Sequence, residues 1–402
     1  MSDLAPYKLS RLELASGLVF GDDAPLAELP EPQPGVTPVQ VLEQAVLAGL
    51  QRPPCLVSFS GGRDSSGILA VATSLARREG LPPPIPATHR FPDAEGSDET
   101  EWQERVIRHL GLDDWVRREF TDEFDCVGPV ATRMLRRHGV LWPCNTHFHI
   151  PLFEAASGGA LLTGIGGDEA FMTPARSVYL GVLRGARRPA PRDVFRVGWA
   201  LAPESLRRFV IGRRFPPVAW WLRPAALAEV RSRLARESAR EPLGWSRRFR
   251  WIRGFHYLKV GLRSLEVVAH DHDVLVAHPF AQPEFLAALA ALQRGDRFQS
   301  RSDGMRAYFA GVLPAELHGR STKARFDGAF WTRYSKELVA DWDGDGVDPE
   351  LVDVDVLREV WRSEAPDARS FTVLQGVWLA RNGGSAEESG AEALEQELDR
   401  VV

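Results

Sequence analysis

The stretch Ser58-Phe59-Ser60-Gly61-Gly62-Arg63-Asp64-Ser65-Ser66 determines how the chain is interpreted. The apolar run at 55–59 predicts a strand, and apolar residues at helical spacing over 65–78 predict a helix. Adjacent glycines let the backbone turn sharply, and the hydroxyls and amides then converge at a helix N-terminus, where phosphate oxygens can bind. The candidate phosphate-binding residues are Ser58, Ser60, Gly61, Gly62, Asp64, Ser65 and Ser66.

Asp64 is expected in the first turn of that helix, where its carboxylate could bind a Mg²⁺ ion that bridges the phosphates. The segment lacks the Gly-Lys-Ser/Thr ending of a Walker loop, and it is not a Gly-x-Gly-x-x-Gly dinucleotide turn. The alternative interpretation is a glycine-rich turn with a serine cap. We therefore expect ATP and Mg²⁺ as ligands of a phosphate loop of another type.

Outward from this unit, strand and helix patterns alternate. Further strands are predicted at 85–91, 115–120 and 160–163, and further helices at 98–110, 124–138 and 147–156. Glu101 follows Asp98 in capping-box spacing, so the helix is expected to begin near Asp98. Together these elements predict an α/β fold with a doubly wound, mainly parallel sheet, whose ligands lie at the carboxyl ends of the strands.

The patterns divide the chain into four segments. We expect a short N-terminal preface and linker at 1–53, the α/β core at 54–176, a helical substrate-binding and closing region without strand signals at 177–382, and an acidic tail at 383–402.

A second glycine-rich turn, Gly164-Ile165-Gly166-Gly167-Asp168-Glu169, follows the predicted strand at 160–163. Asp168 at this strand end would complete a metal site opposite Asp64, and Gly164 and Gly166 are further candidates for cofactor binding. On its own, Gly-Gly-Asp-Glu is a common turn. The Gly-Gly-Asp-Glu turn indicates a metal site only in combination with the first glycine-rich turn.

Together, the two turns resemble the synthetase (ATP pyrophosphatase) domain of the asparagine synthetase family, which includes β-lactam synthetases and lasso-peptide cyclases. The first turn is similar to the Ser-Gly-Gly-x-Asp-Ser pyrophosphate loop of N-type ATP pyrophosphatases. The segments 278–285 and 313–326 are similar to two further family motifs. The resemblance covers about residues 54–330 and implies a sheet of the adenine-nucleotide α-hydrolase type.

The resemblance also implies an ATP-dependent ligase that adenylates a carboxylate, releases pyrophosphate, and then joins the carboxylate to an amine with release of AMP. In that family, the lysine that matches Lys323 neutralises charge on the phosphates. The chain is otherwise rich in arginine and has only three other lysines, Lys8, Lys259 and Lys336. A compact ammonium at Lys323 therefore fits a catalytic role, and an incidental surface lysine is the alternative.

Two departures from the family pattern bear on the reaction. Ser2 stands where glutamine-using members carry a catalytic cysteine, and only a short preface precedes the first turn, so we expect no glutaminase domain. Ile165 stands where asparagine synthetases carry a glutamate and β-lactam synthetases a tyrosine, and isoleucine cannot transfer a proton. Glu169 is the candidate catalytic replacement. We therefore expect a specialised ligase of natural-product or peptide-modifying metabolism, with an ammonia-dependent asparagine synthetase as an alternative.

Two further alternatives belong to other classes. A tRNA-modifying ATP pyrophosphatase is motivated by Trp220-Trp221 and the arginine-rich stretch 247–253, although the formal net charge of -5 argues against nucleic acid as a partner. A non-catalytic regulator on a synthetase fold is motivated by Ile165. Zinc chemistry at His147 and His149 is disfavoured because no third ligand cluster is visible.

The remaining features concern environment and partners. Cys55, Cys126 and Cys144 are expected to be buried, reduced thiols, and no apolar run reaches membrane-spanning length. We expect a cytoplasmic protein with small-molecule or peptide carboxylate and amine substrates, a peptide or carrier partner as a further possibility, no nucleic-acid or membrane partner, and a homodimer as one possible assembly. The identities of both substrates, and whether the amide forms within one molecule or between two, stay open.

Overall fold

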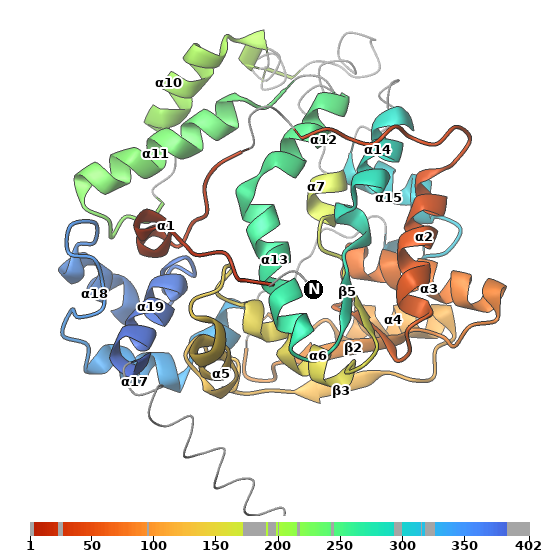
Figure 1. The fold of residues 1–402 in the computed structure, drawn as a ribbon, viewed down its shortest axis with the longest axis horizontal. Coiled ribbons are helices and arrows are strands. Elements are labelled where there is room, and N and C mark those ends of the chain that lie inside the picture. Colours follow the sequence, from red (N-terminus) through yellow and green to blue (C-terminus); the bar gives the residue numbers. More distant parts are fainter. Residues whose placement is uncertain are drawn as a thin grey trace, which may run out of the picture.

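The computed structural model describes residues 4–22, 27–94, 96–171, 190–191, 198–199, 201–214, 218–242, 245–292, 300–314, 316–317 and 326–383. Within these residues, five parallel strands form one sheet in the order β3-β2-β1-β4-β5, with helices on both faces (Figure 1). The strands are β1 (Cys55–Ser58), β2 (Ile85–Arg90), β3 (Val116–Glu119), β4 (Ala160–Leu162) and β5 (Leu275–Ala277). The predicted α/β class with a parallel sheet is confirmed.

The central strand β1 is buried on both sides. Leu56 pairs in register with Ile85 of β2 and with Leu161 of β4. Cys55 and Val57 belong to one core cluster and Leu56 to another, because successive side chains of a strand point to opposite faces. Burial on both faces explains why the strand is a continuous apolar run rather than an alternating one.

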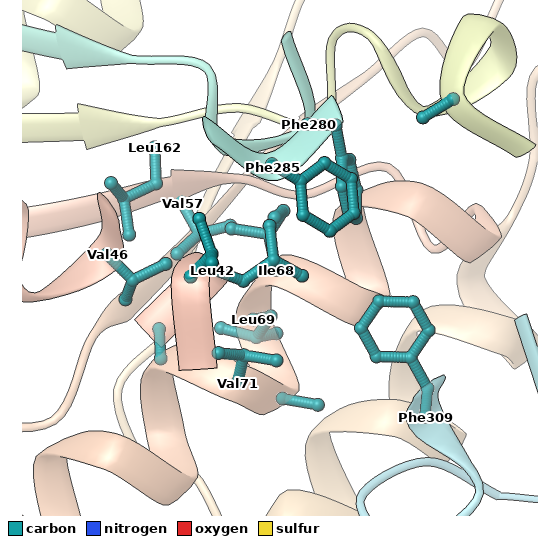
Figure 2. Packing of buried hydrophobic residues seen from close by; sticks show 14 of the residues in the cluster. Leu42, Val46, Val57, Ile68, Leu69, Val71, Leu162, Phe280, Phe285 and Phe309 are labelled. Atoms are coloured by element: carbon teal, nitrogen blue, oxygen red, sulfur yellow. The ribbon is translucent and has the colours of Figure 1, made fainter. Parts of the chain in front are cut away.

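Each face of the sheet has its own helices. One face packs against α2 (Pro38–Leu50), α3 (Arg63–Glu79), α4 (Thr100–Leu110) and α14 (Pro283–Leu292). Figure 2 shows this core, in which Leu42, Val46, Val57, Ile68 and Leu162 meet. The other face packs against α5 (Pro129–His138), α6 (Ile150–Ala155) and α13 (His256–His270). The sheet is therefore the middle layer of three.

Several element boundaries differ from the predicted ones. Helix α4 begins at Thr100 rather than Asp98, because the Asp98 carboxylate accepts a hydrogen bond from the Thr100 N–H (2.9 Å) and Glu99 precedes the helix without a side-chain cap. The predicted capping box is wrong. The predicted helix at 124–138 begins only at Pro129, and the one at 147–156 divides into the 3₁₀ turn η1 (Thr146–His149) and α6.

Strand β5 is the main difference from the predicted architecture. It lies inside the segment 177–382, which we expected to be helical, and it joins the sheet beside β4. The strand has only three residues, all half-buried, and it follows α13 closely, so no strand period could be recognised in the sequence. The sheet thus takes its last strand from beyond the predicted core, whose boundary at 176 stays a prediction.

The other described elements flank the sheet. They are α1 (Arg11–Ser16), α7 (Gly167–Phe171), α10 (Glu204–Arg214), α11 (Pro224–Ala239), α12 (Trp245–Gly254), η2 (Pro279–Ala281), α15 (Arg301–Phe309), η4 (Asp327–Phe330), α17 (Arg333–Ala340), α18 (Val354–Arg362) and α19 (Ser370–Asn382). The N-terminal α1 packs against α19, far away in sequence, and α10 pairs with α11 as a hairpin at the upper left of Figure 1.

The burial of the cysteines agrees only in part with the prediction that all three are buried. Cys55 and Cys126 are buried free thiols, whereas Cys144 is only half-buried. Trp221 is fully buried and Trp220 is exposed, so only one of the pair is a core residue. Most of the acidic tail, 384–402, lies outside the described residues. Among the described residues, no helix combines the length and the apolar character needed to cross a membrane.

Candidate active site

The first predicted turn links β1 to α3. Gly61 has a positive φ of 78°, and Gly62 is the N-cap of α3. The Gly62 N–H donates to Ser60 Oγ (3.3 Å), and the Ser65 hydroxyl donates to the Gly62 carbonyl (3.2 Å). The Ser60 and Ser65 hydroxyl oxygens lie 3.1 Å apart. The turn therefore collects two hydroxyls at the start of a 17-residue helix, the arrangement that binds phosphate oxygens.

The remaining candidates of this turn lie around the same point. Ser66 is buried, and its hydroxyl has no hydrogen-bond partner in the part of the chain that the structure describes. Ser58 is the last residue of β1 and is half-buried. The Gln103 side chain on α4 donates to the Ser60 carbonyl (3.2 Å) and lies so close to Gly61 that a Cβ there would be 2.8 Å from Gln103 Cγ. Packing by α4 thus fixes the turn.

The second predicted turn, after β4, touches the first. A Cβ on Gly164 would lie 2.8 Å from the Ser65 backbone nitrogen, and a Cβ on Gly167 would lie 2.4 Å from Asp64 Cγ. Neither position has room for a side chain. Strands β1 and β4 are neighbours at which the strand order reverses, so their carboxyl ends open onto the crevice where such sheets bind ligands. The two glycines therefore bring the acidic corners of both turns together.

A guanidinium joins the two predicted metal ligands. Arg301, the first residue of α15, pairs with Asp64 through Nη2 and with Asp168 through Nη1. Burial raises the pKa of the Asp64 carboxyl, and the Arg301 charge opposes that rise. Asp64 Oδ1 is buried without a hydrogen-bond partner among the described residues. A cation between two carboxylates, one with an unused oxygen, shows that the pair suits a positive ion.

The predicted third motif packs under the second turn. A Cβ on Gly166, whose φ is 92°, would lie 2.8 Å from the Ala281 nitrogen of η2. Thr163 Oγ1 is 2.6 Å from His278 Nδ1, and the Thr163 N–H donates to the Ala277 carbonyl (3.0 Å). The segment 278–285 therefore supports the site, and its Phe280 ring packs near the Phe309 ring of α15 (Figure 2).

A sequence model of the asparagine synthase family matches residues 39–380, most of the chain. The chain belongs to the asparagine synthase family. The family consists of ATP-using ligases that form amide bonds. A search of curated proteins gave no match. The family match extends beyond the predicted resemblance at both ends, and it covers most of α2 and most of α19.

Membership in the asparagine synthase family raises the question of the proton acceptor. Ile165 is half-buried and packs against the core on the α13 side of the sheet, so its position is filled by an apolar side chain. Glu169, the candidate replacement, accepts a hydrogen bond from the Tyr257 hydroxyl on α13 (3.3 Å). Burial raises the pKa of both groups. The structure thus places a glutamate and a tyrosine together next to Asp168.

Two further predictions concern the charge that faces the phosphates, namely Lys323 and the Mg²⁺ site. Lys323 lies outside the described residues, so its catalytic role stays a prediction. Among the residues that are described, no group of three His, Cys, Asp or Glu side chains has an arrangement that could hold a metal. A pair of carboxylates is nevertheless compatible with Mg²⁺, which commonly takes one or two protein carboxylates and completes its coordination with phosphates and water.

A cavity of 230 Å³ adjoins the first turn across Gln103. Its wall carries both signs of charge, because Arg90 lines it together with Asp98, Glu99 and Glu119. Arg90 Nε and Nη2 are buried and have no hydrogen-bond partner within the described ranges. The cavity can therefore take part of a ligand that offers an anionic group to a guanidinium.

Sequence reasoning missed Arg301, Tyr257 and Arg90. All three are single residues in segments without a recognisable motif, and each reaches the site from an element distant in sequence. Arg301 has one local signal, an arginine directly after the helix-capping Ser300, where a positive charge is unfavourable for the helix.

Proposed function

We propose that this member of the asparagine synthase family is an AMP-forming ligase that adenylates a carboxylate and then forms an amide with an amine. The observation that carries the proposal is the contact between the two acidic turns, where Gly167 leaves room for Asp64 and Arg301 bridges Asp64 to Asp168. Two carboxylates beside a hydroxyl-rich helix N-terminus match a magnesium–polyphosphate ligand.

Each residue then has a defined task. Ser60, Gly61, Gly62, Ser65 and Ser66 would hold the β and γ phosphates at the start of α3. Asp64 and Asp168 would hold Mg²⁺, which supplies charge neutralisation at the phosphates when it is bound. Lys323 would add a further positive charge.

The proposed reaction has two balanced steps. A carboxylate oxygen attacks the α phosphorus, the bond from that phosphorus to the bridging oxygen breaks, and pyrophosphate leaves with the electron pair. The amine nitrogen then attacks the acyl carbon, the bond to AMP breaks, and the ammonium proton passes to a base. Glu169, oriented by Tyr257, is the acceptor that we propose for this proton.

The substrate class follows from the cavity next to the loop. Arg90 offers two buried nitrogens without a hydrogen-bond partner among the described residues, and acidic side chains line the same cavity. A ligand with both a carboxylate and an amine complements such a wall, so we propose an amino acid or peptide as the carboxylate substrate. The amine would come from the same molecule, another peptide or a carrier, in specialised metabolism in the cytoplasm.

Ile165 bears on the second candidate, ammonia-dependent asparagine synthesis. The side chain at this position is apolar and packs against the core, so it offers no acid–base group for ammonia. We therefore favour the specialised ligase over asparagine synthesis.

The test is product analysis of the purified protein with ATP, Mg²⁺ and a panel of amino acids and peptides. We expect stoichiometric AMP and pyrophosphate, and a product whose mass equals that of the substrates less one water. Asp113→Asn, a change at an exposed acid, is the matched control for Asp64→Asn. Release of ADP and phosphate instead, or no release with any substrate, contradicts the proposal.

A further inference from the structure

Arg301 is the most unusual residue of the site, because one guanidinium contacts both predicted metal ligands. Nη2 pairs with Asp64 and Nη1 with Asp168, and the side chains of Arg301 and Asp64 are only 23% and 21% exposed. The planar fork of an arginine suits two separate acceptors in a way that a lysine ammonium does not. The guanidinium therefore occupies the space between the two carboxylates that are the predicted metal ligands.

The helix that carries Arg301 does not itself favour a cation there. Arg301 is the first residue of α15, and Ser300 caps this helix by accepting a hydrogen bond from the Asp303 N–H (3.1 Å). The partial positive charge of a helix N-terminus disfavours an arginine in the first turn. The two carboxylates offset that cost, so the residue is explained by the site and not by the helix.

Packing fixes α15 against both turns. The buried Phe309 ring lies against Gly67 of α3, where a Cβ would be 3.2 Å from the ring, and Gly304 lies against Phe171 of α7. Arg63, next to Asp64, donates to the Ser302 hydroxyl (3.4 Å). Helix α15 thus packs against α3 and α7, the helices that follow the two acidic turns. This packing places Arg301 beside Asp64 and Asp168.

We propose that Arg301 is a resident counter-cation that holds Asp64 and Asp168 together while no metal is bound and moves onto the phosphates when metal and nucleotide bind together. The inference rests on the proposed function, since it takes a polyphosphate as the ligand. Without nucleotide, a divalent ion must displace the guanidinium from both carboxylates. Phosphate oxygens offer Arg301 a new anionic partner and so leave the carboxylates to the metal.

The consequence is coupling between two ligands. Metal alone binds weakly, nucleotide strengthens metal binding, and by linkage metal strengthens nucleotide binding by the same factor. Arg301 is a positioning residue in this scheme. Its removal has opposite effects on the two ligands, because it competes with the metal and attracts the phosphates.

The experiment titrates Mn²⁺ alone into the full chain, followed by electron paramagnetic resonance, and α,β-methylene-ATP with Mg²⁺, followed by calorimetry. For Arg301→Met we expect Mn²⁺ to bind at least tenfold more tightly and the nucleotide at least tenfold more weakly. Arg306→Met, an exposed arginine on the same helix, is the matched control and changes neither affinity. Arg301→Gln replaces Arg301→Met if the latter does not fold, and Asp168→Asn shows that the Mn²⁺ is at this site.

The outcomes separate this inference from the proposed function. A tighter Mn²⁺ and a weaker nucleotide in the same variant, both at the Asp168 site, support the counter-cation. Unchanged or undetectable Mn²⁺ binding in Arg301→Met and Arg301→Gln overturns it, even if the wild-type protein releases AMP and pyrophosphate. Absence of AMP and pyrophosphate with every substrate instead refutes the ligase, whatever the Mn²⁺ affinities are.

Discussion

Two groups of ionisable side chains lie at the carboxyl edge of the same sheet. One group forms ion pairs, and the other consists of buried, neutral rings. In the acidic corner, defined as Asp64 and Asp168, both carboxylates pair with the guanidinium of Arg301. In the histidine cluster, defined as His89, His149 and His278, burial lowers the pKa of each ring, to about 3, about 4 and about 3, so the rings are neutral.

The contrast between ion-paired carboxylates and neutral histidines indicates which of the two groups belongs to the active site. Each histidine has one buried ring nitrogen without a hydrogen-bond partner in the described part of the chain, and His89 Nε2 donates to the Phe148 carbonyl (3.1 Å). Neutral, buried rings pack as part of the interior. Retained charge is costly to bury and persists only where a partner or ligand repays desolvation. We therefore assign the function to the corner and stability to the cluster.

The largest expected effect is loss of one corner carboxylate. Asp64→Asn removes a charged metal ligand but keeps the shape, so AMP formation should fall about 1,000-fold, the rate equivalent of about 4 kcal/mol. His149→Gln, in the cluster, should change the rate by less than about fivefold if the rings have no catalytic role. Initial rates of AMP release measure both. Equal losses in the two variants would abolish the contrast between the two groups.

The next effect tests the close approach of the two turns. Gly167→Ala puts a Cβ 2.4 Å from Asp64 Cγ, so one turn must move. Such crowding costs about 1–3 kcal/mol, and we expect AMP formation to fall up to about 100-fold while the fold persists. Gly311→Ala, where a Cβ meets nothing within 4 Å, is the control. An unchanged rate in Gly167→Ala, measured beside an intact circular-dichroism spectrum, would show that the turns need not touch.

The histidine cluster should make the free energy of unfolding fall as the pH is lowered. Because the folded rings have lowered pKa values, their contribution is complete above the unfolded value of about 6.5 and is lost as the pH falls toward 4. At pH 5 each neutral ring costs about 2 kcal/mol of unfolding free energy. Between pH 7.5 and 5, the unfolding free energy of His278→Gln should therefore fall by about 2 kcal/mol less than that of the wild type. Urea unfolding at the two pH values measures this difference. The exposed His109→Gln should lose as much as wild type.

The smallest effect concerns the charged cavity, which resembles the corner more than the cluster because an arginine and several carboxylates line it. Arg90→Gln removes one ionic hydrogen bond to a substrate carboxylate, worth about 1.5 kcal/mol, so KM should rise about tenfold with kcat unchanged. Steady-state kinetics at varied substrate measure this. A lower kcat at constant KM would place Arg90 in the chemical step instead.

The corner could be predicted from the sequence because its parts are local. Ser60 to Ser66 and Gly164 to Glu169 each follow a buried strand, and parallel strands end at one edge, so the meeting of Asp64 and Asp168 follows from the α/β pattern. The glycines in both stretches indicate that two backbone segments come close together there. This information lies within a few residues of each strand.

The other parts depend on long-range packing that no local pattern encodes. Arg301 reaches Asp64 across 237 positions, and Tyr257 reaches Glu169 across 88. Strand β5 is too short to show a period, and its half-buried residues follow a helix. Of the three clustered histidines, only His149 stands out in the sequence as a candidate ligand, beside His147, because burial and not spacing determines the state of these rings. Tertiary contacts therefore supplied what sequence motifs could not.

The central claim is that the corner activates a carboxylate by joining it to the α phosphate. The most direct measurement uses a carboxylate substrate labelled with ¹⁸O in both oxygens, and follows the mass of the released AMP. We predict one ¹⁸O atom in each AMP, because the carboxylate oxygen that attacked phosphorus stays there when the amine displaces it. Unlabelled AMP, or ¹⁸O in inorganic phosphate released with ADP, would contradict the account.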